Sequence, residues 1–160
     1  MIPSGDLFKE LKKIINNLSG IFEGISFIPH VTLLSGFIGD ESLLLTKVER
    51  LAKSITYFDI HFKEIEFSDN FFQTFFIKVV YSNEFEKVKD LASSQFSFQD
   101  DNLTPHLSLA YGKKELSLKK DLKKTIKIKF ESFTVKSIYL AYNDEINYEW
   151  KVIKKFSLSK

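Results

Sequence analysis

Apolar side chains recur at two spacings along the chain, one typical of helices and the other of strands. Four stretches place them three or four positions apart, which predicts amphipathic helices because one helical turn holds 3.6 residues. These helices are expected at residues 5–19, 40–54, 83–95 and 115–124. Asp40 is a suitable N-cap for the second helix, and Gly20 directly follows the first, as is common at a helix end.

Seven other stretches are rich in Phe, Ile, Val and Tyr, a composition that predicts β-strands. They span residues 27–34, 57–67, 72–81, 104–111, 126–133, 135–142 and 150–158. In the second stretch the apolar alternation changes phase after Phe62, which predicts a β-bulge near Lys63 and Glu64. Helices and strands are mixed without a linker, so we expect an α+β fold in a single domain, residues 1–160.

One short pattern occurs twice: a proline, a histidine, an aliphatic residue, a hydroxyl residue and a leucine. The first copy contains His30 and Thr32, and the second contains His106 and Ser108. Each copy is followed by a glycine, then by a predicted helix and further strands. This weak internal duplication predicts two similar lobes that face each other across a cleft.

Strand geometry determines which of these side chains can act together. Because side chains alternate between the two faces of a strand, His30 and Thr32 share one face while their aliphatic neighbours share the other. The same holds for His106 and Ser108. Each motif is therefore expected to bury two aliphatic side chains and to present an imidazole and a hydroxyl to the cleft.

Two imidazoles and two hydroxyls suit the opening of a cyclic phosphate by water. One histidine can take the proton of the attacking water and the other can protonate the departing sugar oxygen, because the pKa of histidine lies near neutrality. The hydroxyls of Thr32 and Ser108 can donate to the phosphate oxygens. A single motif of this kind is usually structural, so the interpretation depends on the pair. The third histidine, His61, shares its strand face with charged residues and is expected at the surface.

Composition excludes several other kinds of site. The chain has no cysteine, which rules out disulfides, thiolate metal sites and cysteine nucleophiles. Clusters of carboxylates and histidines are absent from the sequence, so no metal or cofactor is expected. The net charge is only +2 and Arg50 is the sole arginine, which argues against a long polyanionic partner. No signal peptide and no apolar run of about 20 residues is visible, so we expect a cytoplasmic monomer without membrane contact.

The two motifs and their surroundings resemble the 2H phosphoesterase superfamily, which is named for two His-x-Thr/Ser motifs. The closest similarity is to the cyclic phosphodiesterases of plants, yeast and some bacteria. Weaker similarity is found at residues 71–73, at residues 137–140 and at Trp150. The resemblance implies a bilobal fold of mostly antiparallel sheets with helices on the outside and both motifs lining a central cleft.

The resemblance also implies a reaction and its residues. ADP-ribose 1″,2″-cyclic phosphate would be hydrolysed to the 1″-phosphate, or nucleoside 2′,3′-cyclic phosphates to 2′-phosphates. His30, Thr32, His106 and Ser108 would be the catalytic residues, and no metal would be required. The substrate would be a small-molecule cyclic phosphate, with RNA only as an alternative.

Two aromatic residues are candidate substrate contacts. Tyr111 matches the position of a tyrosine that contacts substrate in that family, although strand alternation requires the chain to turn at Gly112 for this contact. Phe72 and Phe76 share a predicted strand face that can line the cleft, and Phe72 is the candidate for stacking on a base. Core packing is the alternative for both rings, and Lys78, on the same face, is expected to be solvated.

Several alternatives stay open. Within the superfamily, the chain can instead be an RNA-end enzyme of the 2′-5′ ligase or exonuclease type, or a phage-type enzyme that cleaves cyclic oligonucleotides. A third possibility is a nucleotide-phosphate binding module without turnover. Family members usually begin with a strand before the first helix, whereas only Met1, Ile2 and Pro3 precede the helix signal here, with Ser4 as a possible cap. Either the strand is missing or the true start lies upstream.

Overall fold

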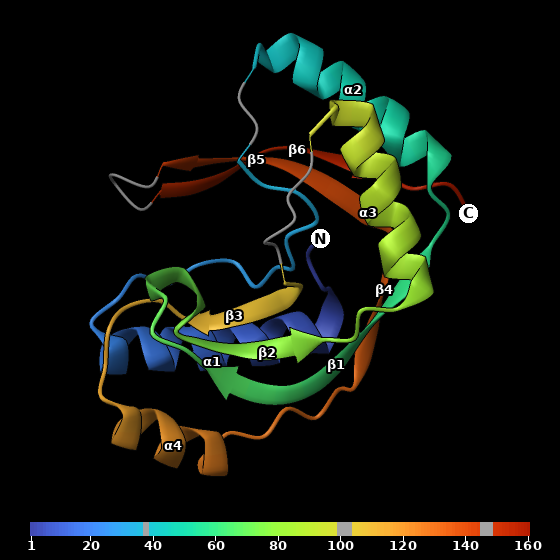
Figure 1. The fold of residues 1–160 in the computed structure, drawn as a ribbon. Coiled ribbons are helices and arrows are strands. Elements are labelled where there is room, and N and C mark those ends of the chain that lie inside the picture. Colours follow the sequence, from blue (N-terminus) through green and yellow to red (C-terminus); the bar gives the residue numbers. More distant parts are fainter. Residues whose placement is uncertain (37–38, 99–103, 145–148) are drawn as a thin grey trace.

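The computed structural model describes residues 1–36, 39–98, 104–144 and 149–160, and Figure 1 shows their arrangement. Its helices are α1 (Gly5–Phe22), α2 (Glu41–Ser54), α3 (Asn83–Phe96) and α4 (Leu116–Thr125), with a short 3₁₀ helix, η1 (Phe71–Gln73). The four α-helices confirm the four that apolar spacing predicts. The predicted end of the first is wrong, because α1 continues through Gly20 and stops only at Glu23, which has φ 53°. Asp40 caps α2 by accepting a hydrogen bond from the backbone N–H of Leu43.

The strands form two antiparallel sheets. β1 (Phe58–Phe67), β2 (Phe75–Val79), β3 (His106–Ala110) and β4 (Ser132–Val135) make one sheet in the order β3-β2-β1-β4, and β5 (Ser137–Asp144) pairs with β6 (Glu149–Ser157). The pairing of β1 with β2 shifts register between Phe62 and Ile65, which confirms the predicted bulge. The fold is therefore α+β, as the sequence predicts.

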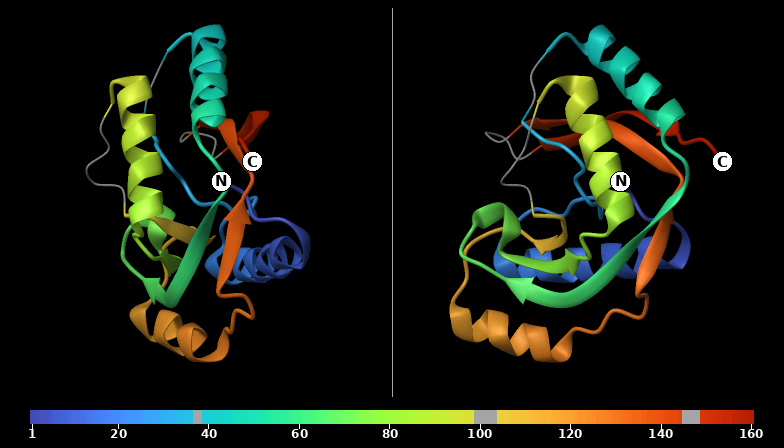
Figure 2. Two further views of the ribbon diagram at one scale, coloured as in Figure 1. Left: turned by 90° about the vertical axis from the view of Figure 1, so that its right-hand side faces the viewer. Right: turned by 45° about the vertical axis from the view of Figure 1, so that its right-hand side comes forward.

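The helices divide between two lobes. α1 packs on β3 and α4 on β1, whereas α2 packs against α3 and against both strands of the β5–β6 hairpin. Figures 1 and 2 show α2, α3 and the hairpin on one side of the molecule and α1, α4, β2 and β3 on the other. β1 runs between the lobes, since it also contacts α3. Leu11 and Ile15 of α1 and Leu107 of β3 are fully buried in the apolar core.

The segment around the first motif differs from its prediction. Residues 27–34 do not form a regular strand, and only Val31 makes an antiparallel bridge, with Leu107 of β3. On its other side Val31 exchanges both backbone hydrogen bonds with Met1, at 2.8 and 2.6 Å. Pro29 has no N–H to extend the ladder, so the pairing stops after one residue. Met1, which belongs to the segment before α1 for which the resemblance implies a strand, thus pairs with the first motif.

Two other predicted strands begin at different residues. The side chain of Asn70 accepts a hydrogen bond from the N–H of Phe72, which favours a turn, so residues 71–73 form η1 and β2 begins only at Phe75. The predicted strand at 126–133 is replaced by β4, which pairs with residues 58–61 of β1. That ladder stops where the bulge of β1 begins, because a bulge disrupts regular pairing.

None of the helices in the described ranges is both long enough and apolar enough to cross a membrane.

Candidate active site

The two motifs meet through one backbone pair. Val31 and Leu107 form an antiparallel bridge, and both side chains are fully buried. In an antiparallel register this bridge sets His30 opposite Ser108 and Thr32 opposite His106, with these side chains on the face away from the buried pair. All four line one cavity of about 800 Å³, to which both lobes contribute. The structure therefore brings the four predicted catalytic residues together, although the first motif is not a regular strand.

Both imidazoles are held by the same backbone contact. Nδ1 of His30 lies 2.7 Å from the carbonyl oxygen of Ile28, and Nδ1 of His106 lies 2.8 Å from that of Thr104. A carbonyl oxygen only accepts hydrogen bonds, so each Nδ1 carries a proton and each Nε2 is the nitrogen left for chemistry. In both motifs the acceptor is two residues before the histidine, with a buried proline between them.

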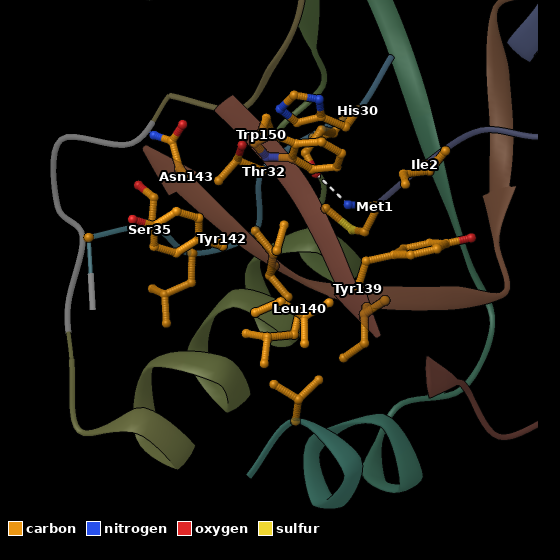
Figure 3. A pocket seen from close by; sticks show the side chains of 18 of the residues that line it. Met1, Ile2, His30, Thr32, Ser35, Tyr139, Leu140, Tyr142, Asn143 and Trp150 are labelled. Carbon is orange, nitrogen blue, oxygen red and sulfur yellow. Dashed lines mark hydrogen bonds between the residues drawn. The ribbon is translucent and has the colours of Figure 1, made fainter. Parts of the chain in front are cut away.

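His30 has an additional aromatic neighbour from the opposite lobe. The indole of Trp150, in β6, stacks on its ring with centroids 4.5 Å apart and planes 10° apart. Figure 3 shows the two side chains next to each other. Phe27 contacts the same ring edge-on, at 6.2 Å. Sequence reasoning noted Trp150 only as a weak resemblance and missed this contact. The only available signal was that Trp150 is the single tryptophan of the chain.

Burial keeps both histidines uncharged at neutral pH. The pKa of His30 is lowered to about 4, with burial as the largest cause and the hydrogen bond to Ile28 opposing it. At low pH, where the Met1 amino group and His106 take up protons, their charges also disfavour a charged His30. Burial also lowers the pKa of His106, against the opposing bond to Thr104. Two neutral imidazoles therefore face the cavity at pH 7. A phosphate that enters it raises both pKa values, because a nearby negative charge favours the protonated form.

The hydroxyl of Ser108 already donates a hydrogen bond within the protein. Ser108 is buried, and its Oγ donates a hydrogen bond to the backbone oxygen of Phe72 at 3.0 Å. A serine has one hydroxyl proton, so the predicted donation to a phosphate requires this hydroxyl to rotate away from Phe72. Thr32, by contrast, is only half-buried where it lines the cavity.

Tyr111 and Phe72 form an aromatic wall of the same cavity. Tyr111 stacks on Phe27 at 4.0 Å, and Phe72 meets the Tyr111 ring edge-on at 5.5 Å. Burial raises the pKa of Tyr111 to about 12 and a hydrogen bond with Ser108 opposes the rise, so its hydroxyl stays protonated at neutral pH. The chain turns directly after it, since Gly112 has φ +125° and donates its N–H to the backbone oxygen of Phe71.

The other residues considered in the sequence take separate positions. Phe76 is buried and lies edge-on to the ring of His106 at 5.4 Å, so it packs in the core, whereas Phe72 is 37% exposed. Lys78 pairs with Glu64 at the surface. His61 is exposed in β1, as predicted. Among the residues that the structure describes, no three His, Asp or Glu side chains cluster as metal ligands would.

The sequence model of the 2′-5′ RNA ligase superfamily matches residues 26–147, a range that contains both histidine motifs. The chain belongs to this superfamily of 2H phosphoesterases. Membership indicates an enzyme that acts on phosphoesters, by hydrolysis or ligation. The site described above places both histidine motifs of the matched range in one cavity.

Solved structures show the same fold as this superfamily member. The crystal structure of TT0787 of Thermus thermophilus has a TM-score of 0.62 at 17% sequence identity, covering 94% of this chain and 92% of that one. A crystal structure of a phosphoesterase has a TM-score of 0.60 at 12% identity, covering 99% of this chain and 96% of that one. A search of curated proteins finds no match.

The burial of His30 predicts a pH-dependent loss of stability. Its pKa is about 4 in the folded protein and 6.5 ordinarily, so the unfolded chain takes up the proton first as the pH falls. The part of the free energy of unfolding that depends on a neutral, buried His30 is therefore complete above pH 6.5. It is lost as the pH falls from 6.5 to 4. We expect the wild type to lose about 2–3 kcal/mol more than His30→Asn over this range.

Urea unfolding in steps from pH 7 to pH 4 measures this difference. His61→Asn, which changes an exposed histidine in β1, is the matched control and should follow the wild-type curve. Parallel curves for the wild type and His30→Asn would contradict the prediction.

Proposed function

We propose that this protein hydrolyses a cyclic phosphodiester without a metal ion, using the two histidines as general base and general acid. The substrate is ADP-ribose 1″,2″-cyclic phosphate, opened to the 1″-phosphate, or a nucleoside 2′,3′-cyclic phosphate, opened to the 2′-phosphate. One observation carries the proposal: both imidazoles line the same cavity, each fixed by an Nδ1–H bond to its own backbone, so that Nε2 is the basic nitrogen of each ring.

The reaction follows from this pair of nitrogens. The neutral Nε2 of one histidine takes a proton from water as the water oxygen forms a bond to phosphorus. The bound phosphate raises the pKa of the other histidine, so its Nε2 takes up a proton from solvent before the step. The bond from phosphorus to one sugar oxygen then breaks, and that oxygen takes this proton. Each carbonyl at Nδ1 stabilises the imidazolium when its ring is charged, because a charged donor makes a stronger hydrogen bond.

The remaining residues of the cavity have roles that fit this reaction. Thr32 supplies a hydroxyl donor to the phosphate oxygens, on which charge builds up as the ring opens. Ser108 does the same once its hydroxyl turns from Phe72. The protonated hydroxyl of Tyr111 hydrogen-bonds with Ser108 and becomes a further donor to the phosphate once it turns from that residue. The ring of Phe72, which is 37% exposed, is the candidate for stacking on a base.

An RNA end or a cyclic oligonucleotide is the alternative substrate. The name of the matching family and the size of the cavity, about 800 Å³, favour this alternative. The net charge of +2 and the single arginine favour a small substrate, because binding of a long polyanion usually depends on many cationic side chains. The two candidate functions differ in the size of the substrate, so turnover of a panel of small and large substrates distinguishes them.

The experiment incubates the purified protein, in EDTA and ¹⁸O-water, with each substrate class at equal concentration. The panel holds a nucleoside 2′,3′-cyclic phosphate, ADP-ribose 1″,2″-cyclic phosphate, a short RNA with a 2′-5′ linkage and a cyclic oligonucleotide. We expect kcat/KM for a small cyclic phosphate to exceed that for either oligonucleotide by about tenfold or more. The product should be a monoester with one ¹⁸O on phosphorus. Turnover of oligonucleotides alone would establish the alternative, and turnover that EDTA abolishes would contradict the metal-free reaction.

A further inference from the structure

The two histidines differ in what covers their rings, although their backbone contacts are the same. Trp150 lies parallel to the ring of His30, whereas the aromatic neighbour of His106 is Phe76, which meets it edge-on. A parallel indole covers a whole face of an imidazole and removes water from it. An edge-on phenyl ring covers much less. The two motifs therefore differ in the aromatic cover of their histidines. The residue that causes this difference, Trp150, lies outside both motifs.

Trp150 reaches His30 from the other lobe. It lies in β6, where its backbone pairs with Asn143 of β5, and the β5–β6 hairpin packs on α2. The backbone of the first motif instead pairs with Met1 and with Leu107 of β3. The stack of Trp150 on His30 thus joins the hairpin to the catalytic face, as the close view in Figure 3 shows.

The contacts of His30 leave its ring little freedom. Ile28 fixes Nδ1, Trp150 covers one face and Phe27 meets the ring edge-on, so rotation of the imidazole would break at least one contact. The hydrogen bond at Nδ1 leaves Nε2 as the basic nitrogen of the ring, and the ring lines the cavity. A base that abstracts a proton from water needs this arrangement, in which one basic nitrogen keeps a fixed direction.

We propose that Trp150 is a positioning residue that holds His30 in place and keeps it uncharged, which makes His30 the general base and leaves His106 as the general acid. This inference rests on the proposed hydrolysis for its catalytic part. The direction of the pKa shifts agrees with it, since burial is the largest cause of the low value at His30. The ionisable groups that act on His30 from the elements packed around it are the Met1 amino group and His106, and Trp150 adds no charge.

The test compares Trp150→Leu, which removes the stack, with Trp150→Phe, which keeps a smaller aromatic cover. Lys151→Gln changes the exposed neighbour in the same strand and is the matched control. The titration of the His30 ring is followed by NMR in the ligand-free protein, with the signal assigned through its loss in His30→Asn. We expect the pKa of His30 to rise by about one unit or more in Trp150→Leu and by less than half of that in Trp150→Phe.

The pH–rate profile supplies the second readout. The acidic limb of kcat/KM should move to higher pH by the same amount as the NMR titration, because the neutral base is the active form. Above that limb, KM should stay within about twofold of the wild type. Lys151→Gln should reproduce the wild type in both measurements.

Two results would overturn the inference. One is an unchanged titration of His30 in a folded Trp150→Leu protein; the other is a higher KM with an unmoved pH profile, which would make Trp150 a substrate contact. If Trp150→Leu does not fold, Trp150→Phe decides alone, since any rise of the His30 pKa must exceed that in Lys151→Gln. The NMR titration needs no turnover, so it tests the inference even if the wild type hydrolyses no cyclic phosphate, a result that would refute only the proposed function.

Discussion

Replacing either His30 or His106 by asparagine is expected to lower kcat/KM for a cyclic phosphate by about 10³-fold or more, because each residue supplies one of the two proton transfers. Asparagine is the sharpest substitution because its side-chain N–H can still donate to the carbonyl that now holds Nδ1. What the variant loses is the titratable Nε2. The fold should therefore survive, and the loss should appear mainly in kcat.

Three comparisons make this experiment decisive. His61→Asn removes an exposed histidine and should keep wild-type activity. The double variant of His30 and His106 should lose little more than either single variant, because groups that act as a unit are not additive. Circular dichroism and urea unfolding at pH 8 establish that each variant is folded. Activity within about tenfold of the wild type in either folded single variant would refute paired acid–base catalysis.

Gly112→Ala is expected to destabilise the protein by about 2–4 kcal/mol, because two independent costs coincide there. The φ of Gly112 is +125°, a conformation that residues with a side chain rarely adopt. A Cβ at this position would also lie 2.9 Å from the backbone oxygen of Phe22, at the end of α1. Relief of either strain must move the turn that places Tyr111, so substrate binding should weaken as well.

Gly20→Ala is the matched control for this substitution. Gly20 lies within α1, and a Cβ added there meets no atom within 4 Å. Alanine favours helix over glycine, so this variant should be unchanged or more stable by up to about 1 kcal/mol. Urea unfolding of both variants gives the two free energies. Equal stability of Gly112→Ala and the wild type would show that the turn can relax without cost.

The sequence predicts those features that depend on local patterns. The four helices follow from apolar spacing, and the bulge of β1 follows from a change of phase in its alternation. The sharing of one cavity by His30, Thr32, His106 and Ser108 follows from strand alternation and the internal repeat. These predictions are correct because the residues that a helix or strand buries in the core are the same residues whose spacing indicates that element in the sequence.

The incorrect predictions arise where one specific contact overrides a pattern. The aromatic residues at 71–73 read as a strand, but the side chain of Asn70 caps a turn there and gives η1. Residues 27–34 have the composition of a strand, yet Pro29 and the single partner Met1 limit the pairing to Val31. The stack of Trp150 on His30 connects residues from opposite ends of the chain, and no local pattern records such a contact.

The hydrogen bonds that orient the two imidazoles have a consequence for how this protein can change over evolutionary time. Their acceptors are main-chain oxygens, at Ile28 and Thr104, and every amino acid carries that oxygen. Enzymes that orient a histidine with a carboxylate depend on that one side chain, and its substitution disorients the ring. Here the side chains at 28 and 104 can be substituted without loss of either acceptor. The orientation of both imidazoles is kept as long as the backbone keeps its course.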